Sequence, residues 1–250
     1  MGEIFKTHAL DIPEICSIIA SSLGRKDLAS CAGVSREWND SFTPSLYKSV
    51  QLSKHVWALS EALKTNSTLT TLSLEGSLMG NNGAQALSEA LKTNSTLTTL
   101  ELKGNQIGDE GAQALSEALK VNSSLARLEL ELNYISGNGA QRLSEALKTN
   151  STLTVLELSF NSIGDEGAQV MSEVLKVNST LTTLTLGCCS IGNNGAQALS
   201  EALKTNSTLT TLKLWHNSIG PGGGQALSDA LKINSMVTIL REWEWELEME

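Results

Sequence analysis

Residue types that perform chemistry are few in this chain, and they are scattered along it. The histidines and cysteines stand at unrelated places: His8, His55, His216, Cys16, Cys31, Cys188 and Cys189. Catalysis needs a nucleophile, a base and orienting groups that converge, and no such set is indicated here. The cysteines lack the spacing of zinc ligands, and no phosphate-binding G-x-x-x-x-G-K-[ST] stretch occurs. We therefore expect a protein that is not an enzyme and that needs no cofactor or metal.

Charged and aromatic residues instead recur between regularly spaced leucines, where they suit the binding of another protein. The candidates for a partner-binding face are Glu75, Glu101, Lys103, Arg127, Glu129, Glu131, Glu157, Phe160, Lys213, Trp215 and His216. The five glutamates form a predicted acidic band, and Ser159, Thr185 and Gly187 form a neutral patch beside it, with Leu132, Tyr134 and Phe160 near the rim. One interpretation is a solvated row of carboxylates without a partner. The other is a basic partner that the band attracts and the aromatic residues anchor.

A 28-residue repeat positions these residues. Six leucines open its copies: Leu69, Leu97, Leu125, Leu153, Leu181 and Leu209. Each copy follows L-x-x-L-x-L-x-x-N-x-I-G-x-x-G-A-x-x-L-S-E-x-L-K-x-N-S, in which the apolar period changes from two to about 3.6 residues. That change predicts a strand, a turn and a helix in every unit. Because one unit cannot bury its leucines alone, we expect stacked units with a parallel sheet on the concave side and helices on the convex side.

Polar residues and glycines at fixed repeat positions predict the turns. Asn105, Asn133, Asn161 and Asn217 follow the strands, where a buried amide can satisfy backbone groups. Ser77 and Cys189 replace this asparagine in two units, and we expect weaker hydrogen bonding there. Six N-S-[ST] sequences, the first at Asn66 and the last at Asn206, are interpreted as helix-closing turns and not as glycosylation sites. The recurrent glycines at 80, 108, 137, 164, 192 and 220 predict permissive backbone angles in the turn before each helix.

The repeat resembles the leucine-rich repeat of the ribonuclease-inhibitor type, which is also common in NOD-like receptors. The resemblance covers residues 57 to about 240. It implies an α/β leucine-rich-repeat solenoid, shaped as a ribonuclease-inhibitor-like horseshoe, that acts as a protein–protein interaction scaffold.

The segment before the repeats has a different pattern, with three short helices expected between residues 10 and 52. Its order of features, Ile12-Pro13-Glu14-Ile15, then Asp27-Leu28, then Val34-Ser35-Arg36-Glu37-Trp38, resembles the F-box, in particular fungal versions that run into leucine-rich repeats. In that family the segment docks onto a Skp-type adaptor of a cullin-RING (SCF-type) ubiquitin ligase, and the repeats choose the substrate. The resemblance implies an adaptor-binding surface made of Pro13, Ile15, Ile18, Ile19, Leu28, Val34 and Trp38.

Two functions stay open at this point. The first is a substrate-recognition subunit of such a ligase, monomeric outside the complex, whose partners are the adaptor and an unknown substrate protein. The second is an adaptor or sensor of the NOD-like-receptor or ribonuclease-inhibitor type, in which the N-terminal helices only cap the first repeat and have no ubiquitin role.

The sequence pattern indicates the domain boundaries, and the net charge limits the classes of partner. The 250 residues divide into an F-box-like helical domain at 1–52, repeats at 53–240 and an acidic, tryptophan-containing tail at 241–250. A formal charge of −9 disfavours nucleic acid and anionic membranes as partners, because both would repel the chain. Neither a signal peptide nor a membrane span is indicated, so we expect a cytoplasmic or nuclear protein.

Overall fold

The structure is a computed structural model that describes residues 52–240, in which short strands alternate with helices. The helices are α3 (Leu52–Thr65), α4 (Gly80–Leu91), α5 (Asp109–Leu119), α6 (Gly137–Leu147), α7 (Gly164–Leu175), α8 (Asn193–Leu203) and α9 (Pro221–Ile233). The strands are β1 (Thr71–Ser73), β2 (Thr99–Glu101), β3 (Arg127–Glu129), β4 (Val155–Glu157), β5 (Thr183–Thr185), β6 (Thr211–Lys213) and β7 (Thr238–Leu240). The predicted strand–turn–helix unit is therefore confirmed throughout this range. No helix within it combines the length and the apolar character that a membrane-spanning segment needs.

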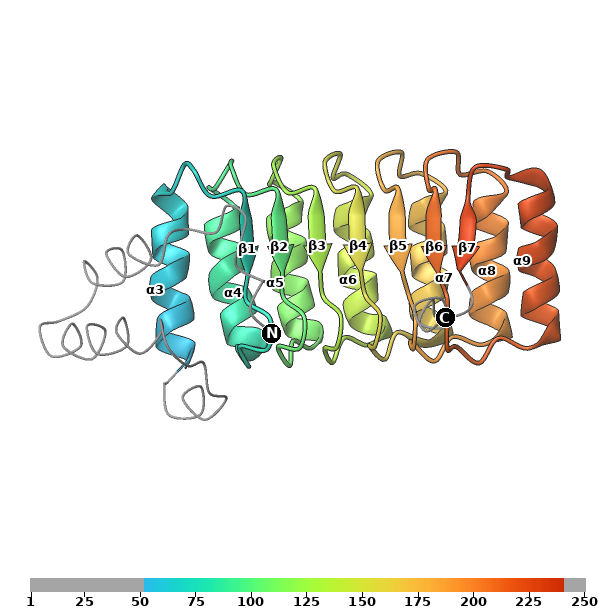
Figure 1. The fold of residues 1–250 in the computed structure, drawn as a ribbon, viewed down its shortest axis with the longest axis horizontal. Coiled ribbons are helices and arrows are strands. Elements are labelled where there is room, and N and C mark those ends of the chain that lie inside the picture. Colours follow the sequence, from blue (N-terminus) through green and yellow to red (C-terminus); the bar gives the residue numbers. More distant parts are fainter. Residues whose placement is uncertain (1–51, 241–250) are drawn as a thin grey trace, which may run out of the picture.

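One parallel sheet joins the seven strands of the described range in chain order. Up to β6, each strand residue pairs with the residue one 28-residue unit later, as Leu100 pairs with Leu128. Between β6 and β7 the sequence spacing of paired residues is one less than 28, because Thr211 pairs with Thr238. Figure 1 shows the strands as one layer and the helices as a second layer behind it, along an elongated molecule. This is the α/β leucine-rich-repeat solenoid that the sequence predicted.

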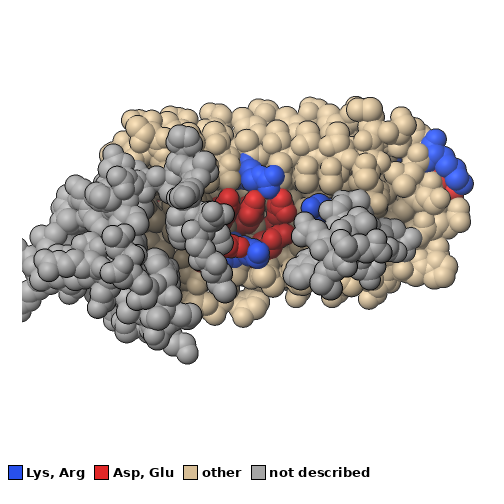
Figure 2. All heavy atoms as spheres, viewed as in Figure 1, with Lys and Arg blue, Asp and Glu red and all other residues tan. Residues whose placement is uncertain are grey.

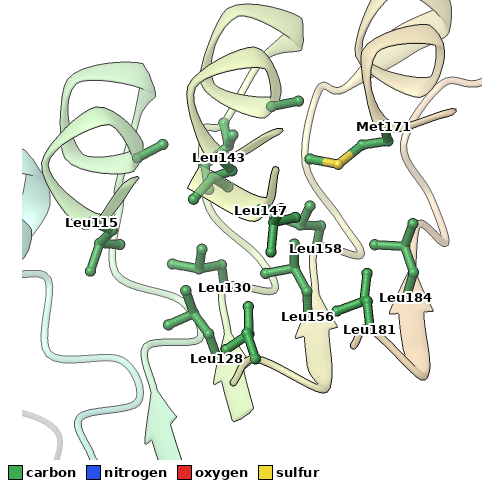
Figure 3. Close-up of a cluster of buried hydrophobic side chains, with 14 of the residues drawn as sticks. Leu115, Leu128, Leu130, Leu143, Leu147, Leu156, Leu158, Met171, Leu181 and Leu184 are labelled. Carbon is green, nitrogen blue, oxygen red and sulfur yellow. The ribbon is translucent and has the colours of Figure 1, made fainter. Parts of the chain in front are cut away.

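Leucines fill the space between the two layers. Leu128 and Leu130 of one unit and Leu156 and Leu158 of the next are fully buried, and helix residues such as Leu143 cover them (Figure 3). Burying one leucine stabilises the fold by about 1.5–3 kcal/mol. Because each helix packs against the next one along the chain, the core is continuous from α3 to β7.

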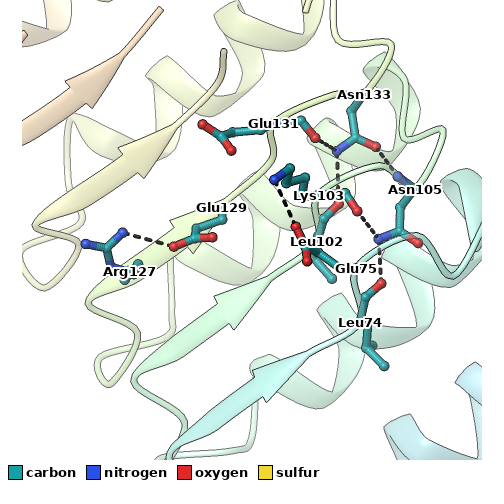
Figure 4. A network of polar contacts seen from close by, with 9 residues as sticks. All are labelled: Leu74, Glu75, Leu102, Lys103, Asn105, Arg127, Glu129, Glu131 and Asn133. Atoms are coloured by element: carbon teal, nitrogen blue, oxygen red, sulfur yellow. Dashed lines mark hydrogen bonds and ion pairs between the residues drawn. The ribbon is translucent and has the colours of Figure 1, made fainter. Parts of the chain in front are cut away.

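Asparagine side chains hold the ends of the strands together. Asn133 donates through Nδ2 to the carbonyl oxygen of Leu102 in the preceding unit at 3.0 Å, while its Oδ1 accepts from the Asn105 N–H at 3.0 Å (Figure 4). Cys189 takes the same place in a later unit, and its Sγ donates to the carbonyl oxygens of Leu158 and Gly187 at 3.3 and 3.4 Å. Since a thiol is a weaker donor than an amide, the hydrogen bonding there is weaker, as expected.

A second set of asparagines closes each helix and explains the N-S-[ST] sequences. Asn150 is 6% exposed; its Nδ2 donates to the Leu119 carbonyl oxygen at 2.8 Å, and its Oδ1 accepts from the Leu153 N–H at 2.8 Å. Asn94, Asn122, Asn178 and Asn206 make the equivalent bonds. These buried amides serve the fold, which confirms their interpretation as turns.

The starts of α5, α6, α8 and α9 are capped by a side chain of the unit before, a feature that was not predicted from the sequence. Asp165 at the start of α7 accepts through Oδ1 from the N–H groups of Gly192 and Gly195 at the start of α8, at 2.6 and 2.9 Å. Asn81, Asp109 and Asn193 do the same for the helices that follow them. Gly137 occupies this position in the third unit and has no side chain to offer, so α7 lacks such a cap.

The glycines before the helices depart partly from expectation. Gly80 and Gly164 have the left-handed φ values of 59° and 65° that require glycine. Gly108, Gly192 and Gly220 are instead in extended conformation, with φ between −83° and −104°, because they are the residues that immediately precede their helices. Of these five glycines, only Gly80 and Gly164 therefore use backbone angles that other residues rarely adopt.

Candidate protein-binding surface

Charged side chains gather near the middle of the strand face, which is the predicted concave face. The sheet register places Glu101, Glu129 and Glu157 side by side on β2, β3 and β4. Figure 2 shows acidic and basic side chains concentrated in this region. Because neighbouring parallel strands lie about 4.8 Å apart, three successive carboxylates would repel one another without compensation.

Two cations lie among these carboxylates. Nη1 of Arg127 is 2.9 Å from Oε1 of Glu129 and 2.7 Å from Oε1 of Glu157. Nζ of Lys103 is 3.2 Å from Oε1 of Glu75 (Figure 4). The expected acidic band is therefore a mixed cluster, which we call the charged cluster. Its members are Glu75, Glu101, Lys103, Arg127, Glu129, Glu131 and Glu157.

The charged cluster keeps an excess of negative charge. It contains five carboxylates and two cations, so its formal charge is −3 when all of them are ionised. The ion pairs among the described residues engage Glu75, Glu129 and Glu157 but include neither Glu101 nor Glu131. Glu101 and Glu131 therefore contribute two of the three excess charges, and the third arises because Arg127 alone is shared by Glu129 and Glu157.

Burial adds to the electrostatic cost of this arrangement. Partial burial raises the pKa of Glu129 above its usual value, and the nearby charges of Glu157 and Glu101 add to that effect against the hydrogen bond from Arg127. Burial and the charge of Glu157 likewise raise the pKa of Glu131, although Lys103 opposes them. Burial lowers the pKa of Lys103, but its hydrogen bond and charge interaction with Glu75 outweigh this and the pKa is raised. The charge interactions among Glu129, Glu131 and Glu157 are therefore unfavourable while these carboxylates are ionised.

The neutral patch next to the cluster is less accessible than expected. Ser159 and Thr185 are buried, with 0% and 1% exposure. Both side chains hydrogen-bond to backbone groups of neighbouring units: Ser159 Oγ accepts from the Gly187 N–H at 3.1 Å, and Thr185 Oγ1 accepts from the Leu158 N–H at 3.2 Å. Thr185 pairs with Glu157 in the sheet register and so lies on the same face as the charged cluster, but it is not accessible to solvent.

The structure brings the three predicted aromatic residues together. The Phe160 and Trp215 rings meet edge to face with centroids 5.1 Å apart, and the Trp215 and His216 rings do so at 5.8 Å. Trp215 is only 7% exposed because its indole lies against Gly187, where a Cβ would come within 2.2 Å of the ring. Of the group, His216 is exposed, whereas Phe160 and the nearby Lys213 are partly buried.

The third residue after the end of each strand from β1 to β6 forms a further row, and its backbone is left-handed. Units one and two use glycine there, with Gly76 at φ 64° and Gly104 at φ 70°. The next four units use larger residues at φ 50–57°: Leu132, Phe160, Cys188 and His216. A non-glycine residue in this region costs about 1–2 kcal/mol. Leu132 and Phe160 were predicted near the rim, but the row itself was not predicted, although the glycines at 76 and 104 could have indicated it.

Two members of the rim are exposed to solvent. Leu132 is 47% exposed and Tyr134 is 68% exposed, and both follow Glu131 closely in the chain. Exposed apolar side chains thus occur within three residues of Glu131 in the chain, and exposed apolar residues of this kind are common where proteins contact one another.

The other predicted sites include residues that the structure does not describe. The residues expected to bind an adaptor all lie outside the described residues: Pro13, Ile15, Ile18, Ile19, Leu28, Val34 and Trp38. The tail at 241–250 also lies outside them. Within residues 52–240, no group of three or more His, Cys, Asp or Glu side chains is arranged to hold a metal ion. Burial raises the pKa of Cys189 to about 12, so this thiol is not activated as a nucleophile.

Three family models match the chain. The model described as F-box-like matches residues 13–53. The model described as Leucine Rich repeat matches residues 65–88, 177–200 and 205–228, and the TMOD/LMOD Leucine-rich domain matches residues 85–162. No relative matches the chain among curated proteins.

Several solved structures are similar to the chain. Leiomodin-1 actin-binding site 2 is 23% identical with a TM-score of 0.45, over 70% of this chain and 87% of that one. The tropomodulin C-terminal domain of Caenorhabditis elegans is 17% identical with a TM-score of 0.45, over 72% and 93%. An internalin from Listeria monocytogenes is 22% identical with a TM-score of 0.45, over 74% and 50%. By its family matches and its own fold, the chain combines an F-box-like segment with leucine-rich repeats, as an F-box/leucine-rich-repeat protein does, and it is a protein-interaction scaffold.

Proposed function

We propose that this chain is the substrate-recognition subunit of an SCF-type (cullin-RING) ubiquitin ligase. The observation that carries the proposal is the F-box-like match at residues 13–53, immediately ahead of a repeat solenoid whose first helix starts at Leu52. In this role the N-terminal segment binds a Skp-type adaptor and the repeats bind the substrate. The chain itself performs no catalysis and needs no cofactor, because other subunits transfer the ubiquitin. It acts in the cytoplasm or nucleus.

The strand face supports this division of labour. Helix sequences such as GAQALSEAL recur almost unchanged from unit to unit, so they offer little to distinguish one partner from another. The strand positions differ between units, and they carry the charged cluster and the exposed Leu132 and Tyr134. A substrate is therefore selected on the strand face, while the adaptor is bound some distance away in the sequence.

The test is recovery of a purified Skp-type adaptor on the immobilised full-length chain. We expect the intact protein to retain the adaptor and a Pro13→Ala, Trp38→Ala double variant to lose most of it, because the F-box resemblance puts both residues on the docking surface. The matched control is Pro221→Ala with Trp57→Ala, which makes the same two changes at the start of α9 and at an exposed position of α3.

Failure of the intact protein to recover any adaptor would overturn the proposal. Equal recovery by the Pro13→Ala, Trp38→Ala variant would instead show that binding does not use the F-box-like surface. Loss of binding by the control variant would point to a general effect on folding, which thermal unfolding of the same samples would reveal.

A further inference from the structure

Four successive units keep a large side chain where glycine would fit better. The row runs from Leu132 to His216 with left-handed backbone, and the first two units show that the repeat accepts glycine at this position. Leu132 is the clearest case, because 47% of it is exposed and it does not belong to the buried core. Its side chain therefore adds little to the fold while its backbone conformation is unfavourable.

Leu132 has acidic and exposed apolar residues close to it in the chain and on the adjacent strand. Its N–H donates to the Ser159 carbonyl oxygen at 3.0 Å, so the third and fourth units are joined at this point. Tyr134, 68% exposed, lies two residues further along the chain. Glu131 precedes Leu132, and Glu157 lies on the adjacent strand. We call Glu131, Leu132, Tyr134 and Glu157 the rim patch.

The electrostatics of the rim patch favour a cation. Lys103 is engaged with Glu75, and Arg127 is shared between Glu129 and Glu157. Glu131 is therefore left without an ion pair among the described residues, although its pKa is raised by burial and by the charge of Glu157. A positively charged group from a partner would offset this repulsion, whereas an acidic segment would increase it.

We infer that the rim patch docks a protein segment in which an arginine or lysine lies next to a large apolar residue. The cation binds between Glu131 and Glu157, and the apolar side chain packs on Leu132 and Tyr134. This inference rests on the proposed function, in which such a segment belongs to the substrate. Its chemistry is complementary to the −3 formal charge of the charged cluster and to the −9 charge of the whole chain.

The experiment screens an array of random synthetic decapeptides with the full-length protein at low salt. We expect the retained peptides to be enriched in arginine or lysine beside leucine or aromatic residues, and their binding to weaken as salt is raised. Enrichment of acidic or uncharged peptides, or no enrichment, would overturn the inference.

Two variants then test the rim patch itself with an enriched peptide. We expect Leu132→Gly and Glu131→Gln each to weaken binding at least tenfold without lowering the Tm, since glycine suits the left-handed backbone and glutamine removes a repelled charge. The controls are Val121→Thr, which removes an exposed apolar side chain at a position where other units carry threonine, and Glu117→Gln on helix α5. Both should bind like the intact protein.

Unchanged peptide binding by Leu132→Gly and Glu131→Gln would overturn the inference. A lower Tm of Leu132→Gly would also overturn the inference, because it would show that the Leu132 side chain stabilises the fold. Recovery of the Skp-type adaptor by the same samples reports on the proposed function separately. A protein that selects basic, apolar peptides but recovers no adaptor refutes the ligase role and leaves the rim patch as a docking surface.

Discussion

At the scale of single residues, the carboxylates of the charged cluster are unfavourable for folding as long as they are ionised. Glu131 is the clearest example, because burial and Glu157 raise its pKa while Lys103 and Glu129 also lie within electrostatic reach. A carboxyl group with a raised pKa in the folded state binds its proton more tightly there than in the unfolded chain. Its unfavourable contribution is therefore present at neutral pH and disappears as the pH falls through the raised pKa toward the ordinary value of 4.5.

Glu131→Gln should accordingly stabilise the protein at pH 7. We expect a gain of about 0.5 kcal/mol, the size typical of a relieved like-charge contact between strands. The difference from the intact protein should vanish by about pH 3, well below the ordinary pKa of 4.5, because Glu131 is then protonated in both states. Thermal unfolding of both proteins across this pH range measures it. A variant less stable than the intact protein at pH 7, or a difference independent of pH, would contradict this electrostatic explanation.

The roles of single residues could be predicted from the sequence at positions where most units carry the same residue. Asn133 and Asn150 were assigned correctly, because the same amide in the same place of every unit indicates a structural bond. The low exposure of Thr185 and Trp215 was not predicted, because it involves neighbours one unit away: the Leu158 N–H for the first and Gly187 for the second. Such contacts between units follow from the stacking and not from the pattern within one unit.

At the scale of elements, the units are linked by side chains that cap the next helix. The Oδ1 of Asp165 accepts two N–H groups at the start of α8, which have no partners inside that helix. A carboxylate near a helix N-terminus also interacts favourably with the helix dipole. The strands and helices themselves were predictable from the apolar period, but these caps were not, because donor and acceptor stand 27 and 30 residues apart.

Asp165→Ala should therefore destabilise the protein by about 1 kcal/mol, the usual size of a lost helix cap. For a chain of this length that corresponds to a Tm lower by about 2–4 °C. Asp165→Asn should have a much smaller effect, since Asn81 and Asn193 provide the same cap elsewhere. Gln169→Ala, at an exposed position of the same helix, is the control. If Asp165→Ala and Gln169→Ala unfolded at the same temperature, the cap would have no energetic role.

At the scale of the whole molecule, the 28-residue repeat explains why the chain forms a solenoid. The choice of a binding partner depends on the positions that differ between units. The sequence predicted the order of strands and helices because each unit must bury its leucines against the next one. It also suggested a band of glutamates on the strand face. It did not predict Arg127 and Lys103 as ion-pair partners within that band, because side-chain pairing across strands depends on the register. Nor did it predict the left-handed backbone of Leu132, Phe160, Cys188 and His216.

The central claim is that adaptor binding and substrate binding use separate parts of one chain. Calorimetric titration of the full-length protein with a purified Skp-type adaptor tests it most directly, with the Pro13→Ala, Trp38→Ala variant and the Glu131→Gln variant in parallel. The claim predicts that the intact protein and Glu131→Gln bind the adaptor with the same Kd, and that the double variant binds at least tenfold more weakly. No measurable binding by the intact protein, or equal weakening by Glu131→Gln, would contradict it.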